Sequence, residues 1–533
     1  MVKLFSYAKG NYNLFLKRDL NKKCIGTTRR GVHTPSSTTY NENIGNNGTN
    51  PKKRPWLIIK DNSVKNILNG FPWVYSKDVK NDNDLFLYSP CIVNIKNEFN
   101  ENIGVGIYNK NSTIVSRILT MNVNENINEE FFNNKIKKAY EKRLELFPND
   151  NFFRVVNAEG DFLPGIVIDK YNKLVSVQVN ASGMDVLLHI ILKSIENVLN
   201  PDTIILKNDS HIRKLEKLSL TKLVYKGLYK PPIEIRENGL TFFTDILKGQ
   251  KTGWYYDQRD NRSMLISYCK DKNVLDLFSY VGGFGITLAY YGANEVTCVD
   301  SSYLAIENGI KSAQYNNVLN KINFVHGCVK KFLNVSLHVK LGTTHNRNNN
   351  IQLLEKSDEQ TDECLDIELE EQNDNNTIEM KKTEHDKKST LFSDMQNIYI
   401  YEKSKDNRID LNDIEKLLIK NNNYDFFQKK YDVILIDPPP LARNNYLLPA
   451  ALKVYQKLLY VSFKIIQKPG YVFVSSCNKL IGYNELVLCI RRALNWAKCE
   501  GVIIGEGRVS SDHPVHVSLP ETKYLTSILL MIT

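Results

Sequence analysis

The string VLDLFSYVGGFG, residues 274–285, combines a carboxylate with a glycine-rich turn. Its first half is typical of a buried strand that ends at Asp276, and Gly282 and Gly283 follow in the turn. Glycine lets the main chain approach a bound ligand where a side chain would clash. The next predicted strand, EVTCVD, ends at Asp300, where a carboxylate can accept hydrogen bonds from both ribose hydroxyls of a nucleoside cofactor. We expect such a cofactor, with glycines that serve only strand–helix packing as the alternative.

A second string, YDVILIDPPP at residues 431–440, places another carboxylate, Asp437, at the end of an apolar strand. The prolines fix φ at successive residues, so the loop is stiff. In a doubly wound sheet the ligand lies at the carboxyl ends of the strands. We therefore expect Asp276, Asp300 and Asp437 to meet in one crevice, although Asp437 as a simple strand cap is the alternative.

The strand YVFVSSC ends at Cys477, which is a candidate nucleophile because a thiolate at a strand end can reach a ligand in the same crevice. Most free cysteines are small buried apolar residues. We assign that role to Cys269, Cys298, Cys328, Cys489 and Cys499. The nine cysteines show no C-x-x-C pair, so neither a disulfide framework nor a metal site is predicted.

The elements that must position these residues alternate as βαβ units. They predict an α/β, Rossmann-like doubly wound sheet over residues 239–335 and 426–533. Residues 336–425 are rich in Asn, Asp, Glu and Lys, and we predict a low-complexity disordered insertion there. Short β-type runs at 55–125 predict a small β-barrel. Residues 126–238 predict a linker helix, Glu129 to Leu146, and a small α/β subdomain.

The first fifty residues form a basic leader. Residues 1–60 hold twelve Lys and Arg against two acids, and the whole chain of 533 residues carries a net charge of +11. This composition resembles a mitochondrial presequence, with a disordered basic arm and a cytoplasmic or other organellar protein as the alternatives. The sequence has no run of eighteen apolar residues, so we expect no membrane span. The oligomeric state is left open, and a homodimer is one option.

Seven strings spread along the chain resemble one family. They are GFPWVYS, RVVNAEGDFLPGIVIDKY, GQKTGWYYDQRDNR, VLDLFSYVGGFG, VILIDPPP, VSSCNK and DHPVHVSLPETKYL. From Trp56 to the C-terminus, excluding the insertion, the chain resembles the ribosomal RNA large-subunit methyltransferases that join a PUA domain to a class I S-adenosylmethionine domain. The bacterial members of this family methylate cytosine at C5. The resemblance implies S-adenosylmethionine as the cofactor, a PUA-type RNA-binding module and ribosomal RNA as the partner.

The resemblance also implies which residues contact the cofactor. Those around it are Asp276, Phe278, Gly282, Gly283, Asp300 and Asp437. Gln258 and Arg259, from the string YYDQRDNR, are implied to cover it, with a salt-bridging role as the alternative for Arg259.

The reaction type depends on Cys477. Because C5 of cytosine is a poor nucleophile, an enzyme first adds a thiolate at C6. Cys477 is the implied nucleophile, and Asp437 is the acid that would orient the base and stabilise developing charge. Two alternatives remain: a guanine base-nitrogen methyltransferase in which Cys477 is incidental, and an RNA-binding ribosome assembly factor without turnover.

Two positions depart from the family pattern. Pro440 stands where the family usually has a basic residue after DPP, and Arg443 is the nearest candidate for its work. At the end of the third sheet strand the chain reads HGCVKK, with Gly327 and Cys328 in the place of an Asp that contacts the adenine amino group. We therefore expect adenine recognition through main chain, or a lower cofactor affinity.

Overall fold

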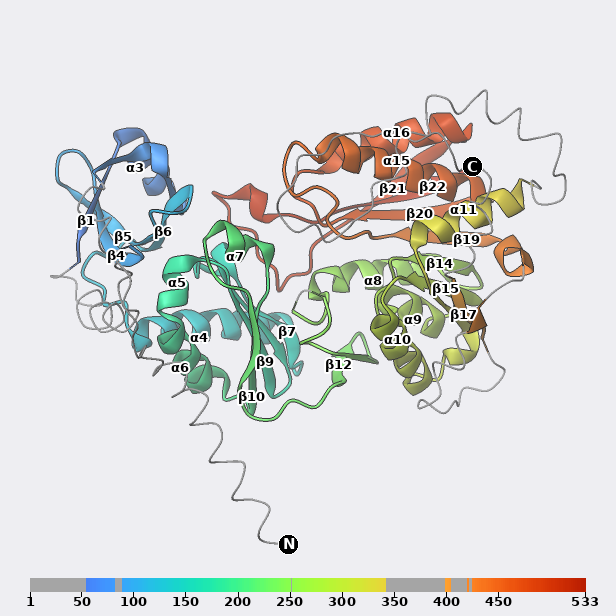
Figure 1. Cartoon of the computed structure of the whole chain (residues 1–533), viewed down its shortest axis with the longest axis horizontal. Helices are drawn as coiled ribbons and strands as arrows, with labels where there is room; N and C mark the ends of the chain where they lie inside the picture. The colour runs from blue at the N-terminus through green and yellow to red at the C-terminus, as the bar shows by residue number, and fades with distance from the viewer. Residues whose placement is uncertain (1–53, 82–88, 251, 342–397, 404–418, 421–423) are drawn as a thin grey trace, which may run out of the picture. The chain divides into compact units, whose positions relative to one another are not determined.

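The computed structural model describes residues 54–81, 89–250, 252–341, 398–403, 419–420 and 424–533, and Figure 1 labels most of their helices and strands. The predicted leader at residues 1–50 and most of the predicted insertion lie outside this described part. No described helix is long and apolar enough to cross a membrane.

The first domain is a six-stranded sheet with the order β2-β6-β5-β4-β1-β3. Its elements are β1 (Trp56–Ile59), α3 (Asp61–Leu68), β2 (Trp73–Tyr75), β3 (Val79–Asn81), β4 (Cys91–Lys96), β5 (Asn102–Tyr108) and β6 (Ile114–Thr120). Buried apolar residues such as Leu57, Val93 and Val115 form its core. The β-type runs of the sequence are confirmed, whereas α3 is an element that they did not predict.

The second domain is a five-stranded sheet with the order β11-β10-β9-β8-β7. It contains α4 (Glu129–Leu146), β7 (Phe152–Asn157), β8 (Ile166–Tyr171), β9 (Leu174–Val179), α5 (Ser182–Val186), α6 (Leu188–Leu199), β10 (Thr203–Asn208), α7 (His211–Leu215) and β11 (Thr221–Lys226). Helix α4 has the predicted bounds. It begins where the Asn128 side chain accepts a hydrogen bond from Phe131 N, which caps the first turn.

The third domain is a nine-stranded sheet with the order β18-β17-β16-β15-β14-β19-β20-β22-β21. Its strands are β14 (Asn273–Leu277), β15 (Glu295–Asp300), β16 (Ile322–His326), β17 (Tyr399–Tyr401), β18 (Ile419–Lys420), β19 (Tyr431–Ile436), β20 (Ile466–Ser476), β21 (Gly501–Gly507) and β22 (Thr526–Ile532). Five neighbouring strands of the sheet, in the order β16-β15-β14-β19-β20, are parallel. Their carboxyl ends therefore share one edge. The strand order reverses beside β14, which is where a doubly wound sheet binds its ligand.

Helices cover both faces of this sheet, as the predicted fold requires. They are α8 (Arg259–Leu265), α9 (Gly283–Tyr290), α10 (Tyr303–Tyr315), α11 (Val329–Lys340), α15 (Leu448–Ile465) and α16 (Tyr483–Ala497). Figure 1 shows α15 and α16 on one side of the sheet and α9 and α10 on the other. Two separate apolar clusters correspond to the two faces: one contains Phe332 and Leu459, and the other contains Leu288 and Ile310.

Three predicted domain boundaries need correction, two of them at the insertion. Helix α11 continues to Lys340, past the expected end at residue 335, and Leu337 and Val339 in this extension pack against the apolar cluster. Within the predicted insertion, β17 pairs antiparallel with β16 and extends the sheet, with Ile400 buried. Because β17 has only three residues and follows a long polar stretch, its alternation of apolar and polar residues is too short to detect in the sequence.

The boundary between residues 238 and 239 falls within a hairpin. Strands β12 (Ile233–Glu237) and β13 (Leu240–Thr244) pair antiparallel across a turn at Asn238 and Gly239, both with positive φ. Phe242 of this hairpin belongs to the same apolar cluster as α9 and α10. The hairpin therefore packs as a unit with the third domain.

Candidate active site

A cavity of about 270 Å³ lies at the carboxyl ends of the parallel strands. Its lining comes from three parts of the chain: a segment from Gln250 to Arg262, the turn after β14 together with Asp300 and Ser301, and the DPPP loop together with Cys477. The site residues predicted from three separate strings therefore meet in one place. Phe278, Gly283 and Gln258 are among the lining residues.

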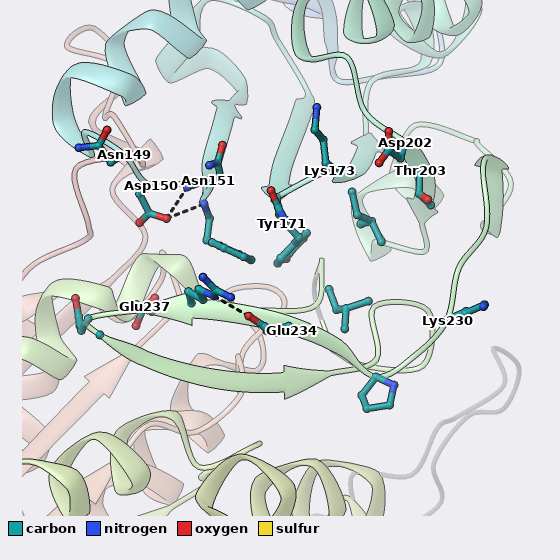
Figure 2. Close-up of a pocket in the computed structure, with 18 of the residues that line it drawn as sticks. Asn149, Asp150, Asn151, Tyr171, Lys173, Asp202, Thr203, Lys230, Glu234 and Glu237 are labelled. Carbon is teal, nitrogen blue, oxygen red and sulfur yellow. Dashed lines mark hydrogen bonds and ion pairs between the residues drawn. The ribbon is translucent and has the colours of Figure 1, made fainter. Parts of the chain in front are cut away.

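A larger cavity, of about 760 Å³, lies between the small α/β sheet and the β12–β13 hairpin (Figure 2). Its described lining contains none of the predicted site residues. The Asp150 carboxylate in it accepts hydrogen bonds from Phe152 N and Arg259, and Glu234 pairs with Arg236. Because the predicted site residues meet in the smaller cavity and not in this one, we place the chemistry in the smaller cavity.

The cofactor side of the smaller cavity is shaped by main chain. Gly282, the residue before α9, has φ 75°, a conformation that favours glycine, and it does not itself line the cavity. A Cβ at Gly283 would lie 3.2 Å from Cη2 of Trp254, and one at Gly285 would lie 2.4 Å from Sγ of Cys298. The turn therefore has no space for side chains at these positions.

Asp276 holds this turn from behind. Its Oδ2 accepts a hydrogen bond of 2.9 Å from Gly285 N, and the side chain does not line the cavity. Burial raises the pKa of Asp276 to about 8, with Asp437 and Asp300 adding to the increase and the Gly285 bond opposing it. Its place is consistent with the predicted cofactor turn, but the contact is with the protein main chain.

Asp300 does line the cavity, at the end of β15. Its two oxygens accept hydrogen bonds of 2.8 Å each from Tyr280 N and Ser302 N. Burial raises its pKa. Phe278 and Tyr280 have positive φ values of 62° and 52°, so the loop after β14 holds two strained residues beside the cavity.

These features fit a nucleoside cofactor. The main-chain turn gives close approach, Asp300 offers oxygen acceptors with remaining lone pairs, and Phe278 and Phe284 give apolar surface. The volume is near the lower end of the range of small-molecule sites.

The opposite side of the cavity is shaped by side chains. Asp437 follows β19 directly and Cys477 follows β20 directly. The half-buried Cys477 thiol lies with Sγ 3.7 Å from the Pro438 carbonyl oxygen, to which it donates. Asn478 donates to Ala442 O at 2.7 Å and so ties the DPPP loop to the end of β20.

Gln258 connects this side of the cavity to the segment from Gln250 to Arg262. Its Nε2 donates to Asp437 Oδ2 and to Ser475 Oγ, both at 3.0 Å, and the side chain is buried. Asn261 Nδ2 donates to Gln258 Oε1 at 2.6 Å. Arg508 N, which can only donate, bonds to Asn261 Oδ1 at 2.9 Å.

This chain of bonds fixes the orientation of both amides. Because a main-chain N–H must face the oxygen of Asn261, the Asn261 nitrogen must face Gln258. The nitrogen of Gln258 must then point toward Asp437. Gln258 therefore presents a donor, and not an acceptor, to the carboxylate.

Arg259 does not line the cavity, and its contact with the cofactor stays a prediction. It is buried against Glu237 and Asp150 and donates to Phe152 O, which is the salt-bridging alternative. Arg262 lines the cavity in its place, one turn later on α8. Glu237 holds Arg262 through Nε at 2.5 Å and Nη2 at 2.9 Å.

Sequence reasoning missed several further lining residues: Trp254, Tyr255, Tyr280 and Arg262. The aromatic-rich string GWYYDQRDNR was the available signal, since an aromatic run beside a crevice predicts ring surfaces for a base or cofactor. Arg443, by contrast, is exposed and lies outside the cavity lining.

The remaining cysteines divide by position. Cys269, Cys298 and Cys489 are buried, as predicted. Cys499 is half-buried, and the prediction for Cys328 is wrong, because it is exposed where α11 begins.

Two family models match the chain. Residues 57–121 match a PUA-like domain, and residues 226–342 match an S-adenosylmethionine-dependent methyltransferase. Proteins named ribosomal RNA large subunit methyltransferase I are similar over most of their length. That of Tolumonas auensis is 26% identical over 483 residues, which cover 89% of this chain and 98% of the relative. That of Shewanella frigidimarina is 25% identical over 478 residues, which cover 89% and 98%.

Two solved structures share the fold. A protein from Streptococcus mutans described as a SAM-dependent methyltransferase aligns with a TM-score of 0.61 and 17% identity, covering 90% of this chain and all of that one. A structure described as a methyltransferase complexed with SAH aligns with a TM-score of 0.62, the same identity and the same coverage. The predicted fold class is thus confirmed. The chain combines a PUA-like domain with a class I methyltransferase domain whose cofactor is S-adenosylmethionine.

Proposed function

We propose that this protein forms 5-methylcytosine in large-subunit ribosomal RNA, with Cys477 as the nucleophile. One observation carries the proposal: Cys477 and Asp437 line the same cavity as Gly283 and Asp300 of the cofactor turn. The printed names of the relatives supply the class of RNA. The PUA-like domain supports an RNA substrate.

The cofactor supplies an electrophilic methyl group, and the chain supplies the activation of the base. In the resting site the Cys477 thiol donates to Pro438 O, so it must lose this proton before it reacts. The thiolate then forms a bond to C6 of cytosine, and the electron pair of the C5–C6 double bond moves toward C5 and N3. Asp437, held by Gln258, would accept a hydrogen bond from the N4 amino group of cytosine and so orient the ring for attack.

The second half of the reaction restores the enzyme. The bound cofactor would supply the methyl carbon to C5 and keep the electron pair of the broken sulfur–methyl bond as a neutral thioether. A base then removes the C5 proton, and the electron pair of that C–H bond reforms the C5–C6 double bond. The S–C6 bond breaks in the same elimination, and Cys477 leaves as a thiolate. The stiff DPPP loop and the Asn478 bond to Ala442 hold the thiol and the carboxylate in fixed positions through both halves.

Trapping tests the proposal directly. RNA that carries 5-azacytidine has nitrogen at the position of C5, so the final proton removal is blocked and the S–C6 bond persists. We expect a covalent protein–RNA complex that resists denaturant, requires the cofactor, and is lost in Cys477→Ser. Cofactor binding by calorimetry should be unchanged in that variant.

Each alternative predicts a different result. A guanine base-nitrogen methyltransferase would transfer methyl groups to RNA without any covalent complex. An assembly factor without turnover would neither transfer nor trap. Mitochondrial import of the basic leader and a homodimer remain proposals, and the leader lies outside the described residues.

A further inference from the structure

Phe162 is an exposed aromatic residue in a conformation that suits glycine. It follows the short 3-10 helix η4 (Ala158–Asp161), with φ 57° and ψ 32° in the left-handed region. A bulky residue there costs free energy that glycine would not. The side chain is 55% exposed, so burial of the ring does not compensate for this strain. Strain of this kind is found mainly where a side chain has a function.

The surroundings of the Phe162 ring hold it in place. The His516 ring packs edge-on against it, with the centroids 5.3 Å apart and an interplanar angle of 69°. Burial lowers the pKa of His516, which keeps this supporting ring neutral. Asp161, the residue before Phe162, is fixed by a bidentate ion pair with Arg143, with both bonds at 2.6 Å.

A cation lies beside the ring. Lys135 Nζ is 5.5 Å from the Phe162 centroid. It belongs to a row on α4 with Lys138 and Lys142, at spacings of three and four residues, which places all three on one helix face. Lys138 and Lys142 are exposed.

The segment around Phe162 is bonded to both other domains. Glu159, in η4, accepts a hydrogen bond of 3.1 Å from Trp73 Nε1 of the PUA-like domain. Asp512, four residues before His516, accepts from Arg154 N with Oδ2 and bonds to Arg143 through its carbonyl. An exposed ring next to a row of cations is the combination that single-stranded RNA requires, since bases stack on rings and phosphates pair with lysines.

We propose that Phe162 is a stacking platform for an unpaired base of the RNA substrate, and that Lys135, Lys138 and Lys142 contact the adjoining phosphates. This inference rests on the proposed RNA methyltransferase function, and it adds a binding site outside the catalytic cavity.

Phe162→Gly gives the sharpest test, because strain and stacking predict opposite effects. Glycine relieves the left-handed strain, so we expect a melting temperature that is unchanged or higher. It also removes the ring, so the Kd for a fluorescein-labelled single-stranded RNA should rise about tenfold. Phe162→Tyr is the matched control and should keep the affinity. A residue that only caps η4 would gain stability in Phe162→Gly without losing any affinity, and that result would overturn the proposal.

The lysine row is tested by salt dependence. Lys138→Gln combined with Lys142→Gln should weaken RNA binding uniformly across sequences and reduce the slope of log K against log salt by about 1 for each lost phosphate contact. Lys193→Gln, on α6, is the control and should leave the slope unchanged. An unchanged slope in the double variant would exclude this path for the RNA.

Failure of this inference differs from failure of the proposed function. If the unmodified protein binds no RNA and gives no covalent complex, the proposed function fails. If it binds and traps RNA equally well with Phe and Gly at position 162, only the platform is excluded. Calorimetry with S-adenosylmethionine should give the same Kd in every variant of this set.

Discussion

Along β14 and β15 the catalytic cavity is shaped by main chain, whereas along β19 and β20 it is shaped by side chains. On the first wall, glycines bring the backbone close and Asp276 bonds to that backbone from behind. On the second wall, Asp437 and Cys477 enter the cavity directly. The main-chain wall is suited to bind the cofactor, whereas the side chains of the second wall determine which reaction the base undergoes.

The two walls are also stabilised differently. The first depends on steric fit, since added methyl groups at Gly283 and Gly285 would meet Trp254 and Cys298. The second depends on a continuous set of hydrogen bonds from Arg508 N through Asn261 and Gln258 to Asp437. Changes to the first wall should therefore alter cofactor affinity, and changes to the second should alter turnover.

Removal of the thiol should have the largest effect. Cys477→Ala deletes the nucleophile without adding volume, so we expect methyl transfer to cytosine to fall by about 10³-fold or more. The measurement is transfer of a radiolabelled methyl group to RNA at saturating cofactor. Cys499→Ala is the control, since that half-buried cysteine lies outside the cavity. Retained transfer in Cys477→Ala would favour chemistry at a base nitrogen.

Reversal of the donor at Gln258 should have the next largest effect. Gln258→Glu places an oxygen where Nε2 now donates to Asp437, so two carboxylates would face each other at about 3.0 Å. We expect turnover to fall by about 100-fold, the scale for loss of one donor to a reacting group. The acidic limb of the pH–rate profile should move to higher pH, because neighbouring carboxylates resist joint ionisation.

Gln467→Glu makes the same change at an exposed position of β20 and controls for added charge. A fall in turnover with an unmoved pH profile would mean that Gln258 supports the fold without controlling Asp437. Cofactor affinity should change little, since the altered contact belongs to the side-chain wall.

The sequence predicted the cavity well because strand ends obey a general rule. Residues that directly follow parallel strands, such as Asp437 and Cys477, meet at one edge whatever the details of packing. The rule does not apply to residues on a helix, because the rotation of the helix about its axis determines which side chains face the cavity. Arg259 and Arg262 are one turn apart on the short helix α8, and only its starting residue determines which of them reaches the cavity. Asp276 lies within β14 and not at its end, so its side chain faces the glycine turn.

Substitution in the main-chain wall should affect binding more than chemistry. In Gly283→Ala the new methyl group would lie 3.2 Å from Trp254 and 3.5 Å from Arg262, which both line the cavity. We expect the Kd for S-adenosylmethionine to rise about tenfold, equivalent to about 1.4 kcal/mol. Turnover at saturating cofactor should stay within about threefold of the original value.

Gly505→Ala is the matched control for Gly283→Ala. The nearest atom to its Cβ is 3.8 Å away, which is ordinary contact, and the position lies in β21 outside the cavity. Equal Kd values for the two variants, measured by calorimetry, would show that the turn does not contact the cofactor.

The smallest effect on activity, but a distinct effect on stability, is expected from Asp276→Asn. Burial raises the pKa of Asp276 to about 8, the nearby Asp437 and Asp300 add to the increase, and the Gly285 bond and Arg262 oppose it. The folded protein therefore holds a proton that the unfolded chain releases above its ordinary pKa of about 4. Stability from this group is full at low pH and is lost as the pH rises toward 8, by at most about 1.4 kcal/mol per pH unit.

Asparagine cannot ionise and can still accept the Gly285 bond, so the variant should lose less stability between pH 5 and 7, by up to about 3 kcal/mol. Urea unfolding of the cofactor-free protein at the two pH values measures this difference. Asp271→Asn, at an exposed turn after α8, controls for the removal of one carboxylate. A slope identical to that of the unmodified protein would mean that Asp276 is ionised in the folded state. The main-chain wall would then carry a buried negative charge behind the cofactor turn. Both walls of the cavity would depend on a charged carboxylate, and the contrast between them would be smaller.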